Sequence, residues 1–559
     1  MKKLNVTISK VSFGRIIRLY KKIYDLEYKY HKNKIWTQLL KNSFAPLLIG
    51  KFDYVVGNPP WINWENLPEF YRNSTKELWN KYGLLEKTKG MGLGKVKRDI
   101  SMLFVARCFD QYVNKDGKLA FLVPFTLYKT QAGAGFRKWL ANNCQVEKIH
   151  DLVTLYPFEG AINRTSLLVI KKGQTNFPIP CVMWHNPRSR GIDQEAELED
   201  VKRETKQFDM ILIPIKKGEP ETPWMIINEK VSNTLQKVIG LSSYEAYEGV
   251  NMGGLDGVYY IKVLSNQSEG LLIENLFDVG KNKVKKIRTI VEYVLVYPII
   301  RGREVKKWYG VYSSYVILPI DSKGENILVS EMKVKYPKSY EYFNQFFDQL
   351  IKRTAEPWKS KLKPYRETSR KRAEKIAPPF YMLFNVKPAL TKYKVVWKNI
   401  AGKISGKAEF SACVITPVED VYLGKKIVIP NVKLMLIPME NEEEAYYVCA
   451  ILNSSITQLI VASYVIETGI STHITENVFI PKFNPKDKLH IKLSELSKKA
   501  HELAKKYYEQ HDLVAWEELK KVEEEIDKTA AKLYGISDEE LEEIKKTLRI
   551  LKEGEAKEE

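Results

Sequence analysis

The chain has 559 residues, of which 89 are Lys or Arg and 68 are Asp or Glu, so its formal net charge is +21. This excess favours a polyanion as the binding partner, although many Lys and Glu together also suit the surface of a thermophile's protein. The five cysteines have no CxxC spacing and the seven histidines form no HxH or HxxxH pair, which argues against a disulfide framework and predicts no metal site.

The amino-terminal segment predicts a soluble protein that begins with one or two amphipathic helices. MKKLNVTISK is not followed by the apolar core of a signal peptide, and no apolar stretch is as long as a membrane span, so we expect a cytoplasmic protein without a membrane partner. Apolar residues recur at helical spacing among many lysines between residues 13 and 41. This pattern predicts helix with one face against a core and the other in water.

The stretch FDYVVGNPPW, residues 52–61, combines a predicted strand with an unusual end. Phe52 to Val56 predict a buried strand, which Gly57 and the two prolines terminate. Asn-Pro-Pro alone is only a turn. The same order also suits chemistry on an exocyclic amine, because the Asn58 side-chain oxygen and the Pro59 carbonyl can accept the hydrogens of the amine while Trp61 stacks on its ring.

Strands and helices alternate after this motif. The predicted elements are a helix at 101–113, a turn at 114–117 (NKDG), a strand at 119–124 (LAFLVP), a helix near 135–142 and strands at 146–151 and 166–171. The alternation predicts part of a doubly wound α/β domain, in which ligands bind at the carboxyl ends of the strands. Asn58 to Trp61 follows such an end.

The pattern changes from about residue 175. Short β-like runs are separated by Pro, Gly and charged loops, with helical pieces at 339–354 and 448–465, which predicts a second domain of mixed α and β structure. Apolar stripes at 493–507 and 516–533 predict two packed helices, and Ser537 with Glu540 predicts the capping box of a last helix.

The motif and the elements that follow it resemble the N6-adenine-specific DNA methyltransferases. KNSFAPLLIGKFDYVVGNPPWINWENLP is similar nearly end to end to the type IIG restriction-modification enzymes, in which methyltransferase and target recognition share one chain. GVNMGGLDGVYY, PIIRGREVKKWY, AILNSS and STHITENVFIPK resemble a TaqI-like specificity domain. The resemblance implies a partial Rossmann-like methyltransferase domain (1–173), a mixed α+β target-recognition domain (174–488) and a helical C-terminal region (489–559).

The resemblance also implies roles for single residues. It assigns the catalytic motif to Asn58, Pro59, Pro60 and Trp61. The first two hold the amino group of a flipped adenine, and Trp61 stacks on the base. Phe158 stands where the family has an aromatic on the other face of the ring, with Tyr156 as a near alternative, and either can instead be a core aromatic.

One part of the family pattern is missing. The Gly-rich turn that holds S-adenosylmethionine normally precedes the catalytic motif, yet the 57 residues before Asn58 contain no Gly-x-Gly turn after a strand. Asn42 stands in the place of a family acidic residue near the cofactor's adenine, and GMGLG (90–94) is Gly-rich but follows the motif. We therefore expect S-adenosylmethionine binding to require a partner polypeptide that carries the upstream half of the sheet. The alternative is that the chain is an inactive remnant.

Basic residues interleaved with aromatics predict where double-stranded DNA binds. KSKLKPYRETSRKRAEK (359–375) has eight basic and two acidic residues, although such a run can equally be a solvated face. The predicted DNA-binding residues are Arg301, Arg303, Lys306, Lys307, Arg366, Arg370, Lys371 and Arg372.

Two functions are consistent with these patterns. The first is a site-specific adenine-N6 DNA methyltransferase of a restriction-modification system, acting as part of a split enzyme. The second is a DNA-recognition subunit or remnant without catalysis. Asp321, Glu331 and Lys333 have a spacing that a nuclease could use, but they fall inside the predicted recognition domain, whereas the resembling enzymes carry the nuclease at the amino end.

Overall fold

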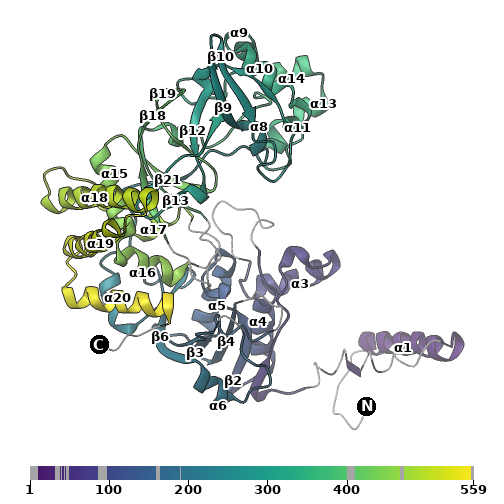
Figure 1. Cartoon of the computed structure of the whole chain (residues 1–559). Helices are drawn as coiled ribbons and strands as arrows, with labels where there is room; N and C mark the ends of the chain where they lie inside the picture. The colour runs from purple at the N-terminus through teal and green to yellow at the C-terminus, as the bar shows by residue number, and fades with distance from the viewer. Residues whose placement is uncertain are drawn as a thin grey trace.

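The computed structural model describes residues 10–31, 38, 41–42, 45, 49–85, 97–158, 164–188, 191–399, 410–465 and 471–554. Their elements form a lower body built on a seven-stranded sheet and an upper body built on a six-stranded sheet (Figure 1). A four-stranded sheet and the C-terminal helices lie between and beside the two bodies. The fold is therefore a sheet-rich α/β structure with a helical C-terminus.

The lower body holds the motif identified in the sequence. Its strands are β1 (Phe52–Gly57), β2 (Val113–Pro124), β3 (Cys144–Asp151), β4 (Thr165–Lys172), β5 (Ile179–His185), β6 (Lys206–Pro214) and β7 (Trp224–Ile227). They lie in the order β1-β2-β4-β3-β5-β6-β7, with β1/β2 and β3/β5 parallel and the other neighbours antiparallel. Three helices accompany them: α3 (Glu69–Lys81), α4 (Ser101–Tyr112) and α5 (Ala134–Asn143). The alternation of strands and helices predicted from the sequence is confirmed here. Trp79, Phe121 and Trp139 are among the buried residues of the core of this body.

The predicted turn at 114–117 is instead part of β2. Phe52 pairs with Val113 and Tyr54 with Lys118, so residues 114–117 all lie opposite Asp53. Asn114 Nδ2 donates to Asp53 Oδ1 at 2.7 Å, and a Cβ on Gly117 would lie 2.7 Å from the Phe52 carbonyl oxygen. The turn-forming residues therefore make a bulge against β1, because the strand pairing holds both of their ends.

The first sheet extends beyond residue 173, the domain boundary predicted from the sequence. Strands β5, β6 and β7 add to β3 and carry the sheet to Ile227. The sequence pattern changes at 173 because these strands follow one another with little helix between them, apart from α6 (Leu198–Glu204). The change in sequence pattern therefore marks a change in how successive strands are connected, and not the end of the sheet.

The upper body is organised around mixed strands and short helices. Its six-stranded sheet contains β9 (Tyr260–Gln267), β10 (Gly270–Asn275), β11 (Arg288–Val291), β12 (Val296–Ile300), β15 (Ser314–Ile317) and β20 (Ile429–Pro430). The helices are α8 (Asp256–Tyr259), α9 (Val329–Lys335), α10 (Pro337–Asn344), α11 (Phe347–Ile351), α12 (Trp358–Lys361), α13 (Lys363–Glu367) and α14 (Arg370–Ile376). One large core with many aromatic residues joins them.

The four-stranded sheet joins this core to the C-terminal helices. It consists of β8 (Tyr247–Glu248), β16 (Tyr393–Lys398), β17 (Ala412–Ile415) and β21 (Leu434–Met439). Val396 packs into the upper core, whereas its neighbours Val395 and Trp397 pack into the core beneath the helices. Alternation along one strand thus lets both faces of the sheet be buried.

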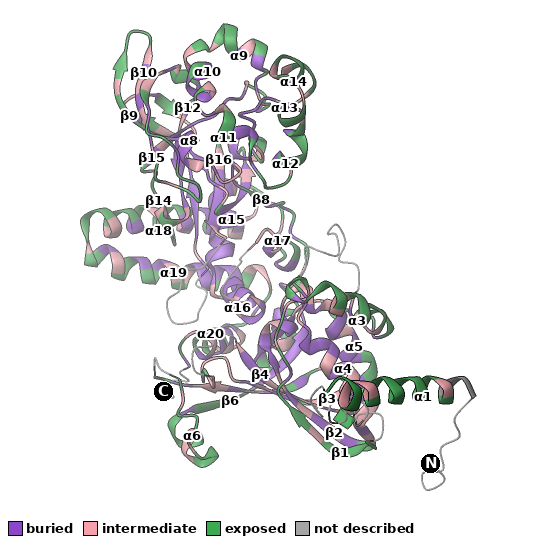
Figure 2. Ribbon diagram, turned by 90° about the vertical axis from the view of Figure 1, so that its right-hand side faces the viewer, coloured by how far each residue is buried: buried purple, intermediate pink, exposed green. Residues whose placement is uncertain are grey.

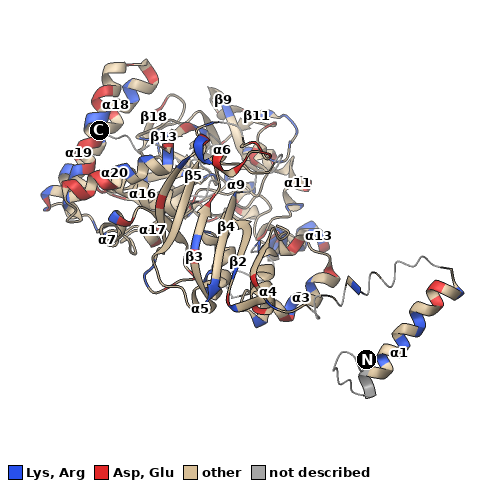
Figure 3. Cartoon of the chain, turned by 90° about the horizontal axis from the view of Figure 1, so that it is seen from below, with Lys and Arg blue, Asp and Glu red and all other residues tan. Residues whose placement is uncertain are grey.

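The C-terminal helices confirm the predicted helical stripes. They are α15 (Glu442–Asn453), α16 (Ser455–Tyr464), α17 (Ile474–Asn477), α18 (Lys488–Gln510), α19 (Leu513–Leu533) and α20 (Asp538–Glu553). Ser537 and Glu540 form the predicted capping box at the start of α20. Figure 3 shows acidic and basic residues mixed along α18 and α19, so neither helix presents a surface of one charge sign.

Helix α1 (Lys10–Tyr24) departs from its prediction. It is amphipathic as expected, but its apolar face has no core to pack on, since Phe13, Ile17 and Tyr20 are 48%, 52% and 70% exposed. Figure 1 shows the helix standing away from the lower body, and Figure 2 shows that it is largely exposed. The apolar face of α1 is therefore uncovered by the other described residues.

No single helix among the described residues is long and apolar enough to cross a membrane. Together α15 and α16 have sufficient length and composition, but they are bent by 56°. Nearly all their residues are buried within the protein.

His501, on α18 beside β17, makes the stability of the fold sensitive to acid. His501 Nε2 accepts a hydrogen bond from the Val414 amide at 2.9 Å, and burial lowers the pKa of His501 from 6.5 to about 4. As the pH falls, His501 therefore takes up a proton in the unfolded chain before it does so in the folded chain. The free energy of unfolding decreases as the pH falls from 6.5 toward 4. We expect the His501→Gln variant to lose less stability over this range, by about 2 kcal/mol.

Urea unfolding at pH 7 and pH 4.5 measures this difference. The same substitution at the exposed His511, His511→Gln, provides the control. An equal acid-induced loss in wild type and His501→Gln would contradict the prediction.

Candidate functional site

Asn58 to Trp61 follows the carboxyl end of β1, as predicted. Asn58 is exposed, and its side chain makes no hydrogen bond within the described part of the chain, whereas Pro59 is buried. Helix α3, which follows the motif, lies on the side of the lower body that faces the upper body (Figures 1 and 2). The Asn58 amide is therefore available to a ligand, and the prolines fix the backbone that carries it.

The structure brings Trp61 and Phe158 together. Their ring centroids are 6.0 Å apart and the ring planes meet at 85°, an edge-to-face contact. The Trp61 indole N–H also points to the Leu122 carbonyl on β2, at 3.4 Å. Tyr156, the alternative partner, makes no ring contact with described residues and has a φ of +46°. A planar ligand between Trp61 and Phe158 would require one ring to turn, because an edge-to-face pair leaves no slot.

The backbone after the motif is pinned to the start of α4. The Trp64 amide donates to the Arg98 carbonyl at 2.7 Å, and the Ile100 amide donates to the Ile62 carbonyl at 2.9 Å. Asp99 accepts from the Ser101 amide at 2.8 Å, and burial raises the pKa of the Asp99 carboxyl. These contacts hold the motif against a core helix, so its position does not depend on exposed loops alone.

A second group of residues at this junction was missed in the sequence. Lys129, which follows β2, is buried and donates to the Ser463 carbonyl at the end of α16, and burial lowers the pKa of Lys129 to about 8. Gln131 lies 3.4 Å from a ring nitrogen of His473, whose other ring nitrogen is 2.8 Å from Glu476. A cavity of about 420 Å³ lies between these segments. In the sequence, the polar run STHITEN was the only indication of the contact between Gln131 and His473, and it does not reveal which segment it contacts.

The predicted cofactor residues do not form a pocket among the described residues. Asn42 is exposed and accepts a hydrogen bond from Gln38 at 3.1 Å. GMGLG lies outside the described residues. In the described part of the chain, no group of three or more His, Cys, Asp or Glu is placed to hold a metal ion.

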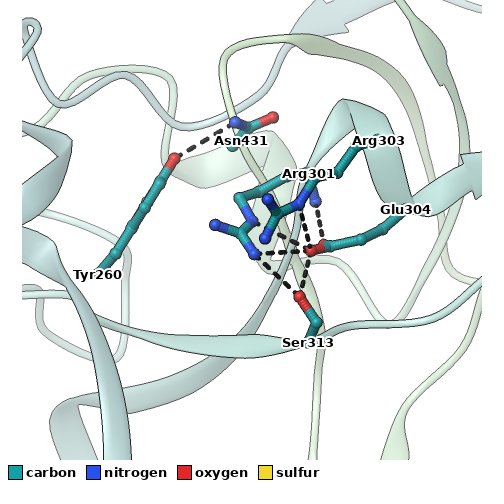
Figure 4. Close-up of polar contacts among 6 residues, drawn as sticks. All are labelled: Tyr260, Arg301, Arg303, Glu304, Ser313 and Asn431. Carbon is teal, nitrogen blue, oxygen red and sulfur yellow. Dashed lines mark hydrogen bonds and ion pairs between the residues drawn. The ribbon is translucent and has the colours of Figure 1, made fainter. Parts of the chain in front are cut away.

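Arg301 lies in a buried polar network (Figure 4). Its guanidinium donates to Glu304 at 2.8 and 3.1 Å and to Ser313 at 2.9 Å, and the Arg301 and Glu304 side chains are only 10% and 8% exposed. The Arg301 amide donates to the same carboxylate at 2.8 Å. This geometry favours a structural role for Arg301, because removing it would leave the buried Glu304 carboxylate with only the longer Arg303 contact, at 3.5 Å, as an ion pair.

The other predicted DNA-binding residues fall into two groups. Lys307 is paired with Glu523 at 2.6 Å, Arg366 donates to the Ile351 and Lys359 carbonyls, and Arg370 donates to Glu374 and stacks on Phe347. Arg303, Lys306, Lys371 and Arg372 are exposed, and of these Arg303 also contacts Glu304 at 3.5 Å. Arg366 is exposed too, but its guanidinium is engaged by the two carbonyls. Lys306, Lys371 and Arg372 make no ion pair with described residues, so their charge is available to a polyanion.

The three residues with nuclease-like spacing do not converge. Lys333 pairs with Glu374 at 2.9 Å, and Glu331 pairs with Lys335 at 2.7 Å. Asp321 accepts backbone amides of its own turn, from Lys323 and Glu325.

Comparison with known proteins relates the segment that contains the motif to a methylase family. Residues 2–158 match the family model of the Eco57I restriction-modification methylase. The chain is 29% identical over 101 residues to the type II methyltransferase M.HincII of Haemophilus influenzae, covering 18% of each chain. It is 21% identical over 380 residues to the type II restriction enzyme and methyltransferase RM.Eco57I of Escherichia coli, covering 65% of this chain and 33% of that one.

The same fold occurs in a solved structure. The type IIL restriction-modification enzyme MmeI, solved in complex with DNA, superposes with a TM-score of 0.50 at 11% identity, covering 89% of this chain and 57% of that chain. The present chain spans at most a third of the length of the two curated relatives above. Residues 2–158 are thus related to the Eco57I restriction-modification methylases.

Proposed function

We propose that the chain is the target-adenine part of a site-specific DNA methyltransferase of a restriction-modification system, which modifies the N6 amino group of adenine. The observation that carries the proposal is the placement of Asn58 to Trp61 at the carboxyl end of β1, inside the segment that matches the methylase family, with Phe158 in contact with Trp61. Asn58 is exposed, as contact with a flipped base requires.

The proposed chemistry rests on two acceptors. The lone pair of the adenine amine is delocalised into the ring, which makes the nitrogen a weak nucleophile. Asn58 Oδ1 and the Pro59 carbonyl would each accept one amine hydrogen and localise the lone pair on the nitrogen. The prolines supply no N–H that could compete for these acceptors. No base has to remove a proton before the amine reacts.

Trp61 and Phe158 would hold the flipped base. Taking a base out of the duplex costs a few kcal/mol, and stacking returns about 1–3 kcal/mol for each aromatic face. The edge-to-face contact at 6.0 Å would open into two parallel faces as the base enters.

S-adenosylmethionine is the methyl donor that the proposal requires, and the described residues do not provide its site. Asn42 is exposed and engaged with Gln38, and no Gly-rich turn precedes β1 in the described residues. We therefore assign cofactor binding to a partner polypeptide, which would supply the remaining part of a Rossmann-like sheet.

The surface around β1 supports such a partner. β1 is the edge strand of its sheet, and no strand pairs with its outer side among the described residues. Tyr54 and Val56 on this strand are 76% and 77% exposed, and the apolar face of α1 is also uncovered. An open apolar edge invites an added strand.

DNA recognition is assigned to the upper body, as a TaqI-like specificity domain. Arg303, Lys306, Lys371 and Arg372 offer exposed charge to the phosphate backbone or to base edges. The complex would act on double-stranded DNA in the cytoplasm.

Transfer of tritiated methyl groups to DNA tests the proposal. The chain, the product of the neighbouring upstream reading frame, and the two together are each incubated with labelled S-adenosylmethionine and bacterial DNA, which is then digested to nucleosides. We expect label only with both proteins, and only in N6-methyladenine. Label in N4-methylcytosine would overturn the assignment of the base.

A second candidate is a DNA-recognition subunit without catalysis. The open edge of β1 favours it, because a sheet that ends at the catalytic strand lacks a place for the methyl donor. DNA binding without methyl transfer under all three conditions would support this alternative.

A further inference from the structure

A hollow in the upper body has no role in the functions described so far. Its volume is about 480 Å³, and it lies between the turn at 253–255, the loop at 281–283 and the segment 349–358. The turn belongs to GVNMGGLDGVYY, one of the segments singled out in the sequence. Gln349 of α11 and the turn that precedes α8 line the hollow, and both helices lie in the upper body (Figure 1).

Three exposed lysines surround the hollow. Lys281, Lys283 and Lys352 make no ion pair or hydrogen bond with other described residues. They come from segments that are about 70 residues apart in sequence, so the fold, rather than one charged run, brings them together. The single acidic residue in the lining is Glu356, which accepts a hydrogen bond from the Ser360 hydroxyl at 2.7 Å.

The wall of the hollow carries a buried positive charge. Arg353 is 4% exposed, and it donates to the carbonyls of Leu350, Phe380 and Met382 at 3.0, 2.6 and 3.0 Å. None of these acceptors carries a charge, and no carboxylate lies within ion-pair distance among the described residues. The guanidinium charge is therefore not cancelled locally, and it adds to the field of the three lysines.

Two glycines shape the opening. Gly253 and Gly254 have φ values of +67° and +80°, and a Cβ on Gly253 would lie 2.8 Å from Arg353 Cδ and 3.0 Å from the Trp358 ring. The Gly253 amide donates to Asn251 Oδ1 at 3.0 Å, and Asn282 Nδ2 donates to the Gly254 carbonyl at 3.1 Å. The last contact ties the lysine loop to the turn, so the cations are held around a backbone that a ligand can approach closely.

We infer that this hollow binds a phosphate of the DNA backbone. The inference rests on the proposed function, since it names a contact of the same protein with the same DNA. Lysine is a point charge that suits a phosphate without reading a base, so the contact would position the duplex between the two bodies rather than select its sequence. The open rim and the exposed lysine ends suit a phosphate on a long polymer.

The test compares two triple variants of the full chain. Lys281, Lys283 and Lys352 are changed to Ala in one, and Lys521, Lys528 and Lys532, exposed on α19, are changed to Ala in the other. Both variants lose the same charge. Duplex affinity is measured between low and moderate salt, and thermal unfolding checks that both variants fold.

We expect the first variant to bind DNA at least tenfold more weakly at low salt and to lower the slope of log affinity against log salt by about 1 for each lysine that meets a phosphate. The α19 variant should match the wild type. If the wild type binds DNA and both variants give equal slopes of log affinity against log salt, the inference is overturned and the proposed function still stands. Absence of DNA binding by the wild type would overturn both. Tight binding of inorganic phosphate to the wild type, with an unchanged DNA slope in the first variant, would mean a small-anion site instead.

Discussion

The Asn58→Ala variant is expected to lose methyl transfer by at least about 100-fold while it binds DNA as the wild type does. The alanine removes the side-chain oxygen that would hold one hydrogen of the adenine amine, and the amine becomes a weaker nucleophile. The side chain makes no hydrogen bond to other described residues and is exposed, so its removal should not affect folding. Initial rates with labelled donor and duplex affinity measure the two effects separately.

Two variants serve as controls for this prediction. Asn66→Ala changes an exposed asparagine of the same segment, beyond the motif, and should keep the wild-type rate. Asn58→Asp retains an acceptor oxygen and should retain part of the rate. Equal losses of DNA binding and transfer in Asn58→Ala would show that Asn58 supports the interface rather than the reaction.

The second large effect concerns the open edge of the sheet. If the proposed cofactor-binding partner adds to β1, replacing both Tyr54 and Val56 with Asp should abolish its association. Each side chain is worth about 1.5–3 kcal/mol when it becomes buried, so the double variant should weaken association by more than about 100-fold. Both residues are more than three-quarters exposed, at 76% and 77%, so the stability of the chain itself should hardly change.

Co-purification with the partner, and calorimetry of S-adenosylmethionine binding, measure this effect. We expect the wild type to bind the cofactor only with its partner and the double variant not to bind it at all. Val334→Asp combined with Val421→Asp provides the control, since these valines are 80% and 85% exposed on the upper body. Cofactor binding by the chain alone would disprove the need for a partner.

The parts of the fold that the sequence predicted are those determined locally. β1 and its end follow from a β-branched run and two prolines, and α18 to α20 follow from apolar stripes and caps. The prediction that β1 is buried was wrong, because β1 lies at the edge of its sheet and all of its residues but one are exposed. The contact of Trp61 with Phe158 came from the family resemblance instead, because β2, β3 and their connections separate the two residues.

The remaining features depend on partners that are distant in the chain. Residues 114–117 look like a turn, and only pairing with β1 makes them a bulge. Arg353 lies within the helical piece predicted at 339–354 but follows the end of α11, and it is held by carbonyls of Met252 and Met382 that are distant in the chain. Arg301 was predicted to meet DNA from composition alone, although Glu304 three residues later was available as its partner.

The most direct test of the central claim is photochemical cross-linking of the target base. The DNA sequence that is methylated is determined first, and 5-iodouracil then replaces the target adenine in a duplex. The complex is irradiated, and the linked peptide is identified by mass spectrometry. A cross-link to Trp61 or Phe158 is the predicted result, because the flipped base would lie between these rings. A cross-link confined to the upper body would contradict the assignment of Asn58 to Trp61 as the adenine site.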